Sequence, residues 1–252
     1  MTEEAQKKTA VVTGASTGIG EATVRALAAD GWKVFAVARR TERLTALGAE
    51  TGAVPVTADI NNDDDLAALL RTVTEAGGAD TLVNIAGGAR GSDTLGNAKT
   101  DDWDWMYQVN VLGTMKIIRA FLPMLRAHGE GTVLNLTSTA GLAAYEGGGG
   151  YNAAKFAQHA LTNALRLEEA ENNLRVIEVA PGLVRTEEFA LNRLGDEDAA
   201  AKVYAGVEKP LTAEDVADVV KYAISVPHHI NLDHITVRPV AQAANHKLIR
   251  KG

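Results

Sequence analysis

Short apolar runs rich in β-branched side chains alternate along the chain with longer stretches that have helical spacing. The short runs predict seven strands, at residues 10–13, 33–37, 54–58, 81–85, 131–136, 175–179 and 233–237. The longer stretches predict helices near residues 19–30, 41–49, 62–76, 103–127, 151–170 and 212–225. Strands that are separated by helices need crossover connections, so we expect an α/β fold with a mostly parallel sheet covered on both faces.

The chain is predicted to form one domain. Its 252 residues are 46% hydrophobic, which is enough for one sizeable core. No repeat, long charge run or linker rich in proline and serine divides residues 1–252. The only low-complexity patch is the run of four glycines at 147–150, for which a flexible loop and a gate over a substrate are equally good interpretations.

Composition excludes several classes of function. A net charge of −7 argues against nucleic-acid binding, and the absence of cysteine excludes disulfides, thiol nucleophiles and zinc–thiolate sites. Residues 1–9 are polar, and no segment approaches the ~18–20 uninterrupted apolar residues of a membrane span. We therefore expect a cytoplasmic protein without a membrane partner. The adjacent His228 and His229 cannot share one helix face, so no metal site is expected.

A glycine-rich turn follows the first predicted strand. Gly14, Gly18 and Gly20 stand where a strand passes into a helix. Glycine lets the chain turn tightly and lets its backbone approach a pyrophosphate, and the helix start adds free N–H groups and a positive dipole end. The turn therefore predicts a nucleotide site.

The end of the second predicted strand indicates which nucleotide is bound. In dinucleotide folds an acidic residue about 20 positions after the glycines holds a free ribose hydroxyl. Here Arg39 stands nineteen residues after Gly20 and is followed by Arg40. Two guanidinium groups suit a 2′-phosphate, so NADP(H) is the predicted cofactor.

Tyr151 and Lys155 are the strongest chemical signal in the chain. Four residues apart on a predicted helix, their side chains share one face. A neighbouring ammonium favours the ionised phenol, so we expect the pKa of Tyr151 to fall from about 10 toward working pH. Such a phenol is a general acid or base for an alcohol or carbonyl.

These motifs, taken in order, resemble those of the short-chain dehydrogenase/reductase family over nearly the whole chain. The family's glycine motif matches residues 13–20, and its Tyr-x-x-x-Lys pair matches Tyr151 and Lys155. Further family positions match Asp59-Ile60, Asn84-Ile85-Ala86-Gly87, Asn110, Ser138 and Pro181-Gly182 with Val184 and Thr186. Ile85 departs from the pattern because the family has a second asparagine there, and we interpret it as tolerated variation.

The resemblance implies a fold and a set of site residues. The fold would be a single-domain, doubly wound, parallel seven-stranded sheet (Rossmann fold) of order 3-2-1-4-5-6-7, with the ligand beyond the carboxyl ends of the strands. The implied catalytic residues are Asn110, Ser138, Tyr151 and Lys155. The implied cofactor contacts are Gly14, Ser16, Thr17, Gly18, Ile19, Gly20, Arg39, Arg40, Asp59, Ile60, Asn84, Ala86, Gly87, Tyr151, Lys155, Pro181, Gly182, Val184 and Thr186.

The family also implies a role for each catalytic residue. Tyr151 would exchange a proton with the reacting oxygen, and Ser138 would hold that oxygen in place. Lys155 would favour the phenolate and bind the nicotinamide ribose. Asn110 would hold a helix irregularity and a water that relays protons to Lys155.

The last third of the chain resembles the branch of NADP-dependent 3-hydroxy acid, serine and allo-threonine dehydrogenases. This resemblance rests on residues 180–189, 209–217, 226–233 and 237–240. It implies a small-molecule substrate, a 3-hydroxy acid or β-hydroxy amino acid, held at Ser138 and Tyr151, in a pocket formed by loops near 88–99, 139–150 and 183–210. Arg90 or Arg185 would bind its carboxylate.

Other functions remain open in the sequence. A reductase of a neutral ketone or biosynthetic carbonyl compound is the main alternative. A non-catalytic NADP-binding regulator is disfavoured because Ser138, Tyr151 and Lys155 are all present, and the chain is too short for an extended sugar-nucleotide epimerase. The helices near 103–127 and 151–170 carry apolar residues beyond one stripe, and the family pairs such helices, so we expect a homotetramer, with a dimer as the second possibility.

Overall fold

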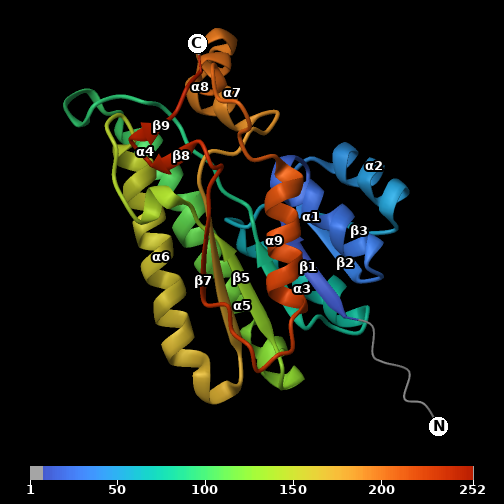
Figure 1. Cartoon of the computed structure of the whole chain (residues 1–252). Helices are drawn as coiled ribbons and strands as arrows, with labels where there is room; N and C mark the ends of the chain where they lie inside the picture. The colour runs from blue at the N-terminus through green and yellow to red at the C-terminus, as the bar shows by residue number, and fades with distance from the viewer. Residues whose placement is uncertain (1–7, 252) are drawn as a thin grey trace.

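Seven parallel strands form the centre of the molecule (Figure 1). The computed structural model describes residues 8–251. The strands are β1 Thr9–Thr13, β2 Lys33–Ala38, β3 Val54–Thr57, β4 Thr81–Asn84, β5 Thr132–Leu136, β6 Arg175–Pro181 and β7 His234–Val237. They pair in the order β3-β2-β1-β4-β5-β6-β7. The predicted fold and strand order are therefore confirmed, with strand ends shifted by one or two residues.

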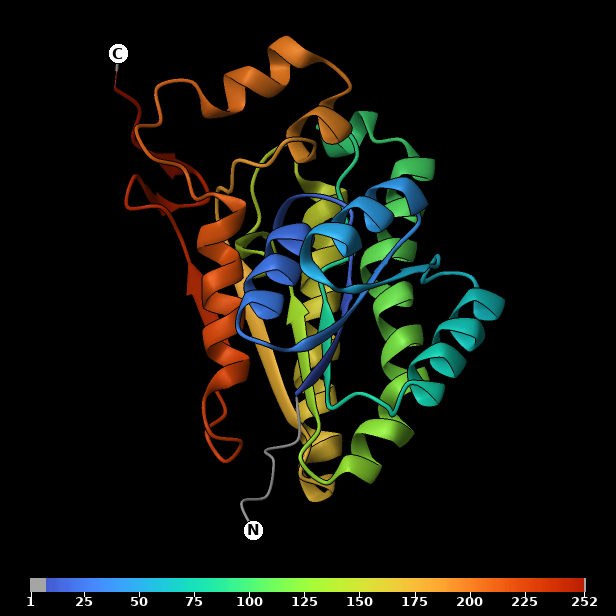
Figure 2. The same cartoon turned by 90° about the vertical axis from the view of Figure 1, so that its right-hand side faces the viewer.

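Helices cover both faces of the sheet (Figure 2). One face packs against α1 Gly18–Ala29, α2 Thr41–Thr51 and α9 Ala213–Ser225, and the other against α3 Asp63–Glu75, α5 Gly113–His128 and α6 Gly149–Glu169. Side chains alternate between the two cores, since Val12 belongs to the first and Val11 to the second. The central strands β1, β4, β5 and β6 are buried on both faces, which explains why their sequences are mostly apolar, whereas the edge strands β3 and β7 are partly exposed.

The helix predicted near 103–127 is interrupted in the structure. It comprises α4 Thr100–Tyr107, a π-helical turn over Gln108–Leu112 and then α5. Asn110 lies in the π-helical turn. A π turn inserts one extra residue and leaves backbone groups to be paired by side chains, which periodicity alone cannot reveal.

Several short elements beyond the carboxyl ends of the strands were not predicted. They include α7 Phe189–Leu194, α8 Glu197–Tyr204, β8 Gln242–Ala244 and β9 Lys247–Leu248, together with the 3₁₀ turns Leu95–Asn97 and Thr139–Gly141. A further 3₁₀ turn, Ala170–Asn172, lies at the opposite end of the sheet, between α6 and β6. In Figure 1, α7 and α8 rise above the sheet, close to the C-terminus. None of the helices in residues 8–251 has the length and apolar character needed to cross a bilayer.

Candidate active site

A cavity of about 860 Å³ opens at the carboxyl ends of the strands. Residues that follow β1, β2, β5 and β6 all contribute to its lining, among them Gly14, Arg39, Ser138 and Gly182. This volume lies within the range of small-molecule and cofactor sites. The cavity lies where the strand order reverses, which is the place where open α/β sheets bind their ligands.

The turn between β1 and α1 requires glycine at two positions. Gly14 has φ +68°, and a Cβ there would lie 2.8 Å from the backbone nitrogen of Ala86. A Cβ on Gly20 would lie 2.2 Å from the carbonyl oxygen of Gly14. Beside them, the buried hydroxyl of Thr17 has no hydrogen-bond partner among the described residues. An unpaired donor at the start of α1, next to a backbone free of Cβ atoms, fits a pyrophosphate.

Arg39 and Arg40 line the cavity at the end of β2. Arg40 donates from Nε and Nη2 to Ser16 Oγ, at 3.1 and 3.0 Å. Its Nη1 donates to both carboxylate oxygens of Glu188, at 2.8 and 2.9 Å. This hydrogen bond to Arg40 lowers the pKa of Glu188, with Arg43 contributing. Arg40 thus joins the glycine turn to the segment that follows β6.

Tyr151, Ser138 and Lys155 lie together on the cavity wall. Tyr151 is in the first turn of α6, and Ser138 follows β5, where its Oγ accepts from the Ala140 backbone at 3.1 Å. The Lys155 ammonium donates to Gln158 Oε1 at 2.7 Å and to the Leu136 carbonyl at 3.3 Å. It lies 5.7 Å from the centre of the Tyr151 ring.

The expected fall in the Tyr151 pKa is wrong for this structure. Burial raises the pKa of Tyr151, and Tyr145 adds to the rise, while hydrogen bonding with Ser138 and the charge of Arg193 act against it. Burial also lowers the pKa of Lys155 to about 7, opposed by the carboxylate of Glu178. Desolvation is the largest cause of both pKa shifts, and the ammonium donates its hydrogen bonds to Gln158 and the Leu136 carbonyl instead of to the phenol.

Comparison with known proteins identifies the family. A family model described as short chain dehydrogenase matches residues 8–196. This chain belongs to the short-chain dehydrogenase family. It is 48% identical over 240 residues to an uncharacterised oxidoreductase of Mycobacterium tuberculosis, covering 95% of this chain and 94% of that protein.

Two similar proteins with informative names are serine dehydrogenases. A serine 3-dehydrogenase of Agrobacterium fabrum is 34% identical over 238 residues, which is 93% of this chain and 95% of that protein. The solved closed form of a serine dehydrogenase complexed with NADP+ has a TM-score of 0.91 at 33% identity. That comparison covers 97% of this chain and 100% of the other. The resemblance to the serine dehydrogenase branch is therefore confirmed, and this short-chain dehydrogenase is an oxidoreductase.

All but three of the predicted site residues of this short-chain dehydrogenase line the cavity. The exceptions are Asn84, Asn110 and Arg185. Asn84 is buried between strands and donates from Nδ2 to Asn135 Oδ1 at 2.9 Å, so its side chain is part of the core. Arg185 is exposed, and its guanidinium lies 5.7 Å from the centre of the Tyr204 ring without lining the cavity itself.

Asn110 braces the backbone instead of lining the cavity. It is fully buried, its Nδ2 donates to the carbonyls of Gly88 and Met106 at 2.9 and 2.7 Å, and its Oδ1 accepts from Gly88 N at 3.2 Å. These bonds tie the π-helical turn to the segment after β4.

Ile85, which stands where the family has a second asparagine, is accommodated without that amide. The Thr13 hydroxyl accepts hydrogen bonds from the backbone nitrogens of Ile85 and Ala86, at 3.0 and 3.1 Å.

The glycine run 147–150 allows close helix packing in this short-chain dehydrogenase. A Cβ on Gly150 would lie 2.5 Å from the Met106 side chain and 2.9 Å from Trp103. The last two glycines therefore let the start of α6 approach α4 closely.

Sequence reasoning missed parts of the cavity lining. Arg193 and Phe189 come from α7, and Gln242 and Asn245 come from the segment around β8. The Asn245 side chain donates to the carbonyls of Thr139 and Ala143. These bonds hold the hairpin of β8 and β9 against the loop after β5. No motif or periodicity in the sequence marks these positions.

One group of three possible metal ligands lies among residues 8–251. It comprises His159, Glu178 and His234. Glu178 is buried and accepts from Thr137 Oγ1 at 2.6 Å, and its other oxygen is 2.7 Å from His159 Nδ1. His159 Nε2 is in turn 3.0 Å from the Asn163 amide. These contacts form a hydrogen-bond network around the buried Glu178 carboxylate. We therefore assign the three residues a structural role in satisfying that carboxylate.

Proposed function

We propose that this short-chain dehydrogenase interconverts a small 3-hydroxy acid or β-hydroxy amino acid and its 3-oxo counterpart. The observation that carries the proposal is the convergence of Tyr151, Ser138 and Lys155 on one cavity that also holds a phosphate-binding turn. The choice of substrate is supported by the similarity to serine dehydrogenases over more than nine-tenths of the chain. A further support is that two arginines, Arg90 and Arg193, line the same cavity as Tyr151, because a substrate carboxylate needs a cationic partner.

The cofactor is NADP(H), as in the serine dehydrogenase complex that this chain resembles. When bound, it supplies or accepts the hydride. In this chain, the β1–α1 turn and the Thr17 hydroxyl would hold its pyrophosphate, and Arg39 and Arg40 its 2′-phosphate. Lys155 would bind the nicotinamide ribose.

The proton chemistry is assigned to Tyr151. The phenol is protonated at neutral pH and lines the cavity, so it can donate its proton to a carbonyl oxygen during reduction, and the burial that raises its pKa makes it a weaker acid than a free phenol. In the reverse direction it would take the proton of the alcohol. Ser138, hydrogen-bonded to the phenol, would hold the reacting oxygen at the distance that proton transfer needs.

A neutral ketone is the second candidate substrate. The ring of Phe189 lies 5.9 Å from that of Tyr151 in an edge-on arrangement, and both line the cavity. An aromatic side chain beside the reacting group suits an uncharged substituent. A substrate panel of 3-hydroxy acids, β-hydroxy amino acids and neutral ketones, monitored by NADPH absorbance, distinguishes the two.

Tyr151→Phe tests the catalytic assignment. The substitution keeps the ring and removes the proton donor, so turnover should fall by ~10²–10⁴-fold with NADPH affinity retained. Turnover is measured on the best substrate of the panel, and affinity by fluorescence titration. Near-normal turnover would exclude Tyr151 as the proton donor.

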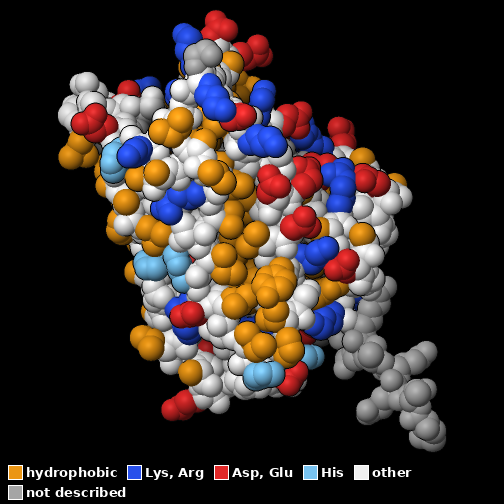
Figure 3. All heavy atoms as spheres, in the orientation of Figure 1, with side chains coloured by type: hydrophobic (Ala, Val, Ile, Leu, Met, Phe, Trp, Pro, Cys, Tyr) orange, Lys and Arg blue, Asp and Glu red, His pale blue; other side chains and the backbone are white. Residues whose placement is uncertain are grey.

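We also propose a homotetramer in the cytoplasm. The outer face of α6 exposes Phe156 and Leu167, and α9 exposes Tyr222. Figure 3 shows apolar side chains gathered over α9 and its boundary with β7. Large exposed apolar patches mark interaction surfaces.

The mass in solution tests the assembly. Light scattering after gel filtration should give four times the 26.6 kDa chain mass, and Leu167→Arg should reduce the measured mass. A monomer at micromolar concentration would refute the assembly.

A further inference from the structure

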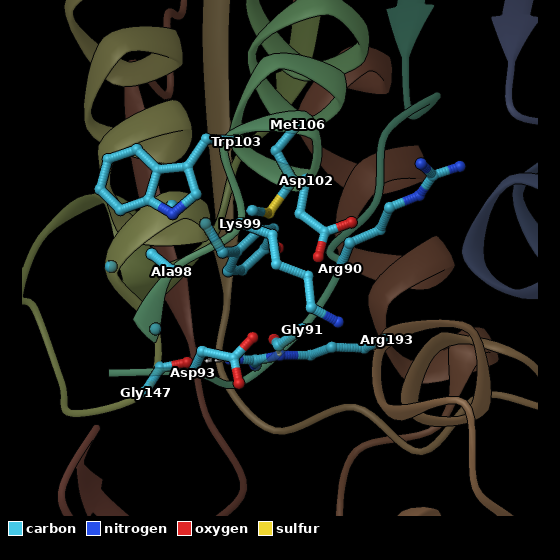
Figure 4. A pocket seen from close by; sticks show the side chains of 14 residues that line it. Arg90, Gly91, Asp93, Ala98, Lys99, Asp102, Trp103, Met106, Gly147 and Arg193 are labelled. Carbon is cyan, nitrogen blue, oxygen red and sulfur yellow. Dashed lines mark hydrogen bonds between the residues drawn. The ribbon is translucent and has the colours of Figure 1, made fainter. Parts of the chain in front are cut away.

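Arg193 occupies a position beside the reacting phenol that the sequence did not indicate. It lies on α7, and its guanidinium carbon is 5.9 Å from the centre of the Tyr151 ring and 5.6 Å from that of Tyr145. It lines the main cavity and also a small pocket of about 20 Å³ that adjoins it. Figure 4 shows its side chain extending toward Gly91 and Gly147 at this pocket.

Three hydrogen bonds hold the guanidinium in one orientation. Nε donates to the Gly91 carbonyl at 3.1 Å, Nη1 to the Tyr145 hydroxyl at 2.9 Å, and Nη2 to the Gly147 carbonyl at 3.1 Å. The Gly91 backbone nitrogen also donates to the Arg193 carbonyl at 2.8 Å. A group fixed in this way loses little side-chain entropy when a ligand binds.

The same contacts leave part of the guanidinium available. An arginine has five N–H donors, and three are used, so one remains on each terminal nitrogen. A carboxylate accepts two such hydrogen bonds in a two-point contact.

No carboxylate within residues 8–251 forms an ion pair with Arg193. The acids of the small pocket, Asp93 and Asp102, line it without bonding to this arginine. Arg193 is half-buried, and a charge withdrawn from water is stabilised by an anionic partner. The three hydrogen-bond acceptors that hold it are all neutral.

The two arginines favoured by the sequence are placed less suitably. Arg185 does not line the cavity. Arg90 lines it but is exposed, and its guanidinium lies 4.1 Å from the centre of the Trp105 ring. Of the three, only Arg193 lies over the ring of Tyr151.

We propose that Arg193 binds the carboxylate of the substrate, and that the substrate is a short acid whose carboxylate and reacting carbon are separated by few atoms. This inference rests on the proposed function. Because the cation lies against the proton donor, a carboxylate on Arg193 leaves room for only a short spacer before the alcohol carbon. Tyr145 acts as a positioning residue, since its hydroxyl orients the guanidinium.

The test compares each acid with its neutral amide. Arg193→Met should raise KM for a 3-hydroxy acid, such as 3-hydroxybutyrate, by about 10–100-fold, the loss expected for a charge-assisted contact. KM and turnover for 3-hydroxybutyramide and the Kd for NADPH should stay within about twofold, since neither needs this contact. Arg193→Lys should restore part of the acid affinity, and Tyr145→Phe should weaken it less than Arg193→Met does.

Arg185→Met is the matched control, because it removes an exposed arginine outside the cavity and should leave all substrates unchanged. If the wild-type enzyme accepts acids and Arg193→Met keeps their KM, Arg193 is not the clamp and the proposed function stands. If Arg193→Met loses acid and amide turnover equally, with a lower melting temperature, Arg193 is only a structural brace. If the wild-type enzyme accepts ketones and no acid, both the clamp and the acid substrate are excluded.

Discussion

At the scale of single residues, burial determines the chemistry of this site more than charge pairing does. Tyr151 and Lys155 lie one helical turn apart, yet the pKa of the phenol is raised and that of the ammonium is lowered to about 7. Glu178 is the charge that supports the ammonium form. Both shifts favour the uncharged form of a buried group, so the phenol keeps its proton and the ammonium loses its own more readily than in water.

The depressed pKa of Lys155 has a consequence for stability. The unfolded chain binds a proton at this lysine up to about pH 10.5, whereas the folded protein releases it from about pH 7. Between these values the unfolded state holds more protons, so the contribution of Lys155 to the free energy of unfolding rises with pH. The charged form is the one that burial disfavours.

Lys155→Met removes this titration. Compared with the variant, the wild type should gain on the order of 2–3 kcal/mol in free energy of unfolding between pH 7 and 9.5, measured by urea denaturation. Lys209→Met, which removes an exposed ammonium, should follow the wild-type pH dependence. Parallel curves for the wild type and Lys155→Met would show that burial does not perturb this lysine.

At the scale of elements, the π-helical turn between α4 and α5 positions the segment after β4. Among residues 8–251, Asn110 is the side chain of this turn that hydrogen-bonds to that segment. It bonds to both the N–H and the carbonyl of Gly88. Gly88 follows Gly87 on the cavity wall. The irregular turn therefore fixes one side of the site.

Asn110→Ala should be strongly destabilising. It leaves the N–H and carbonyl of Gly88 and the carbonyl of Met106 without these partners, and buried unpaired groups cost ~1–3 kcal/mol each. We expect a loss of roughly 3 kcal/mol or more in free energy of unfolding, by urea denaturation. Asn97→Ala, at an exposed side chain with one 3.4 Å bond, is the control and should change stability little. A loss below about 1 kcal/mol for Asn110→Ala would mean that water replaces the amide.

At the scale of the whole molecule, the segment after β6 connects the part of the cavity around Tyr151 with the part around Arg40. It carries Arg193 beside Tyr151, and Glu188 in contact with Arg40 and Arg43. The Glu188 carboxylate thus occupies Arg40, one of the two arginines proposed for the 2′-phosphate. We therefore expect cofactor binding and the position of this segment to be coupled through the ion pair between Glu188 and Arg40.

Glu188→Gln tests this coupling. Removing the competing carboxylate should tighten NADPH binding by about 3–10-fold, a modest effect because the pair is partly exposed, and leave NADH binding unchanged. Glu187→Gln is the control, since Glu187 is exposed and lies 3.6 Å from Arg43. Fluorescence titration of both cofactors decides the matter. Weaker NADPH binding by Glu188→Gln would mean that Glu188 orients Arg40 for the phosphate.

The strands, the glycine turn and the shared face of Tyr151 and Lys155 were predictable from local sequence patterns. Apolar runs and helical spacing are local patterns, so they locate the strands and helices without tertiary information. Tyr151 and Lys155 share a helix face because they are four residues apart, and Gly14 and Gly20 are required by the geometry of one turn.

Which charged groups meet, and how burial shifts their pKa values, could be learned from the three-dimensional structure alone. Arg193 reaches Gly91 across 102 residues of sequence, and Arg40 reaches Glu188 across 148. Asn84 turned out to be a core residue, because β5 brings Asn135 beside it. Electrostatic fields and desolvation act through space over a few ångströms, so they depend on segments that the sequence separates and the fold brings together.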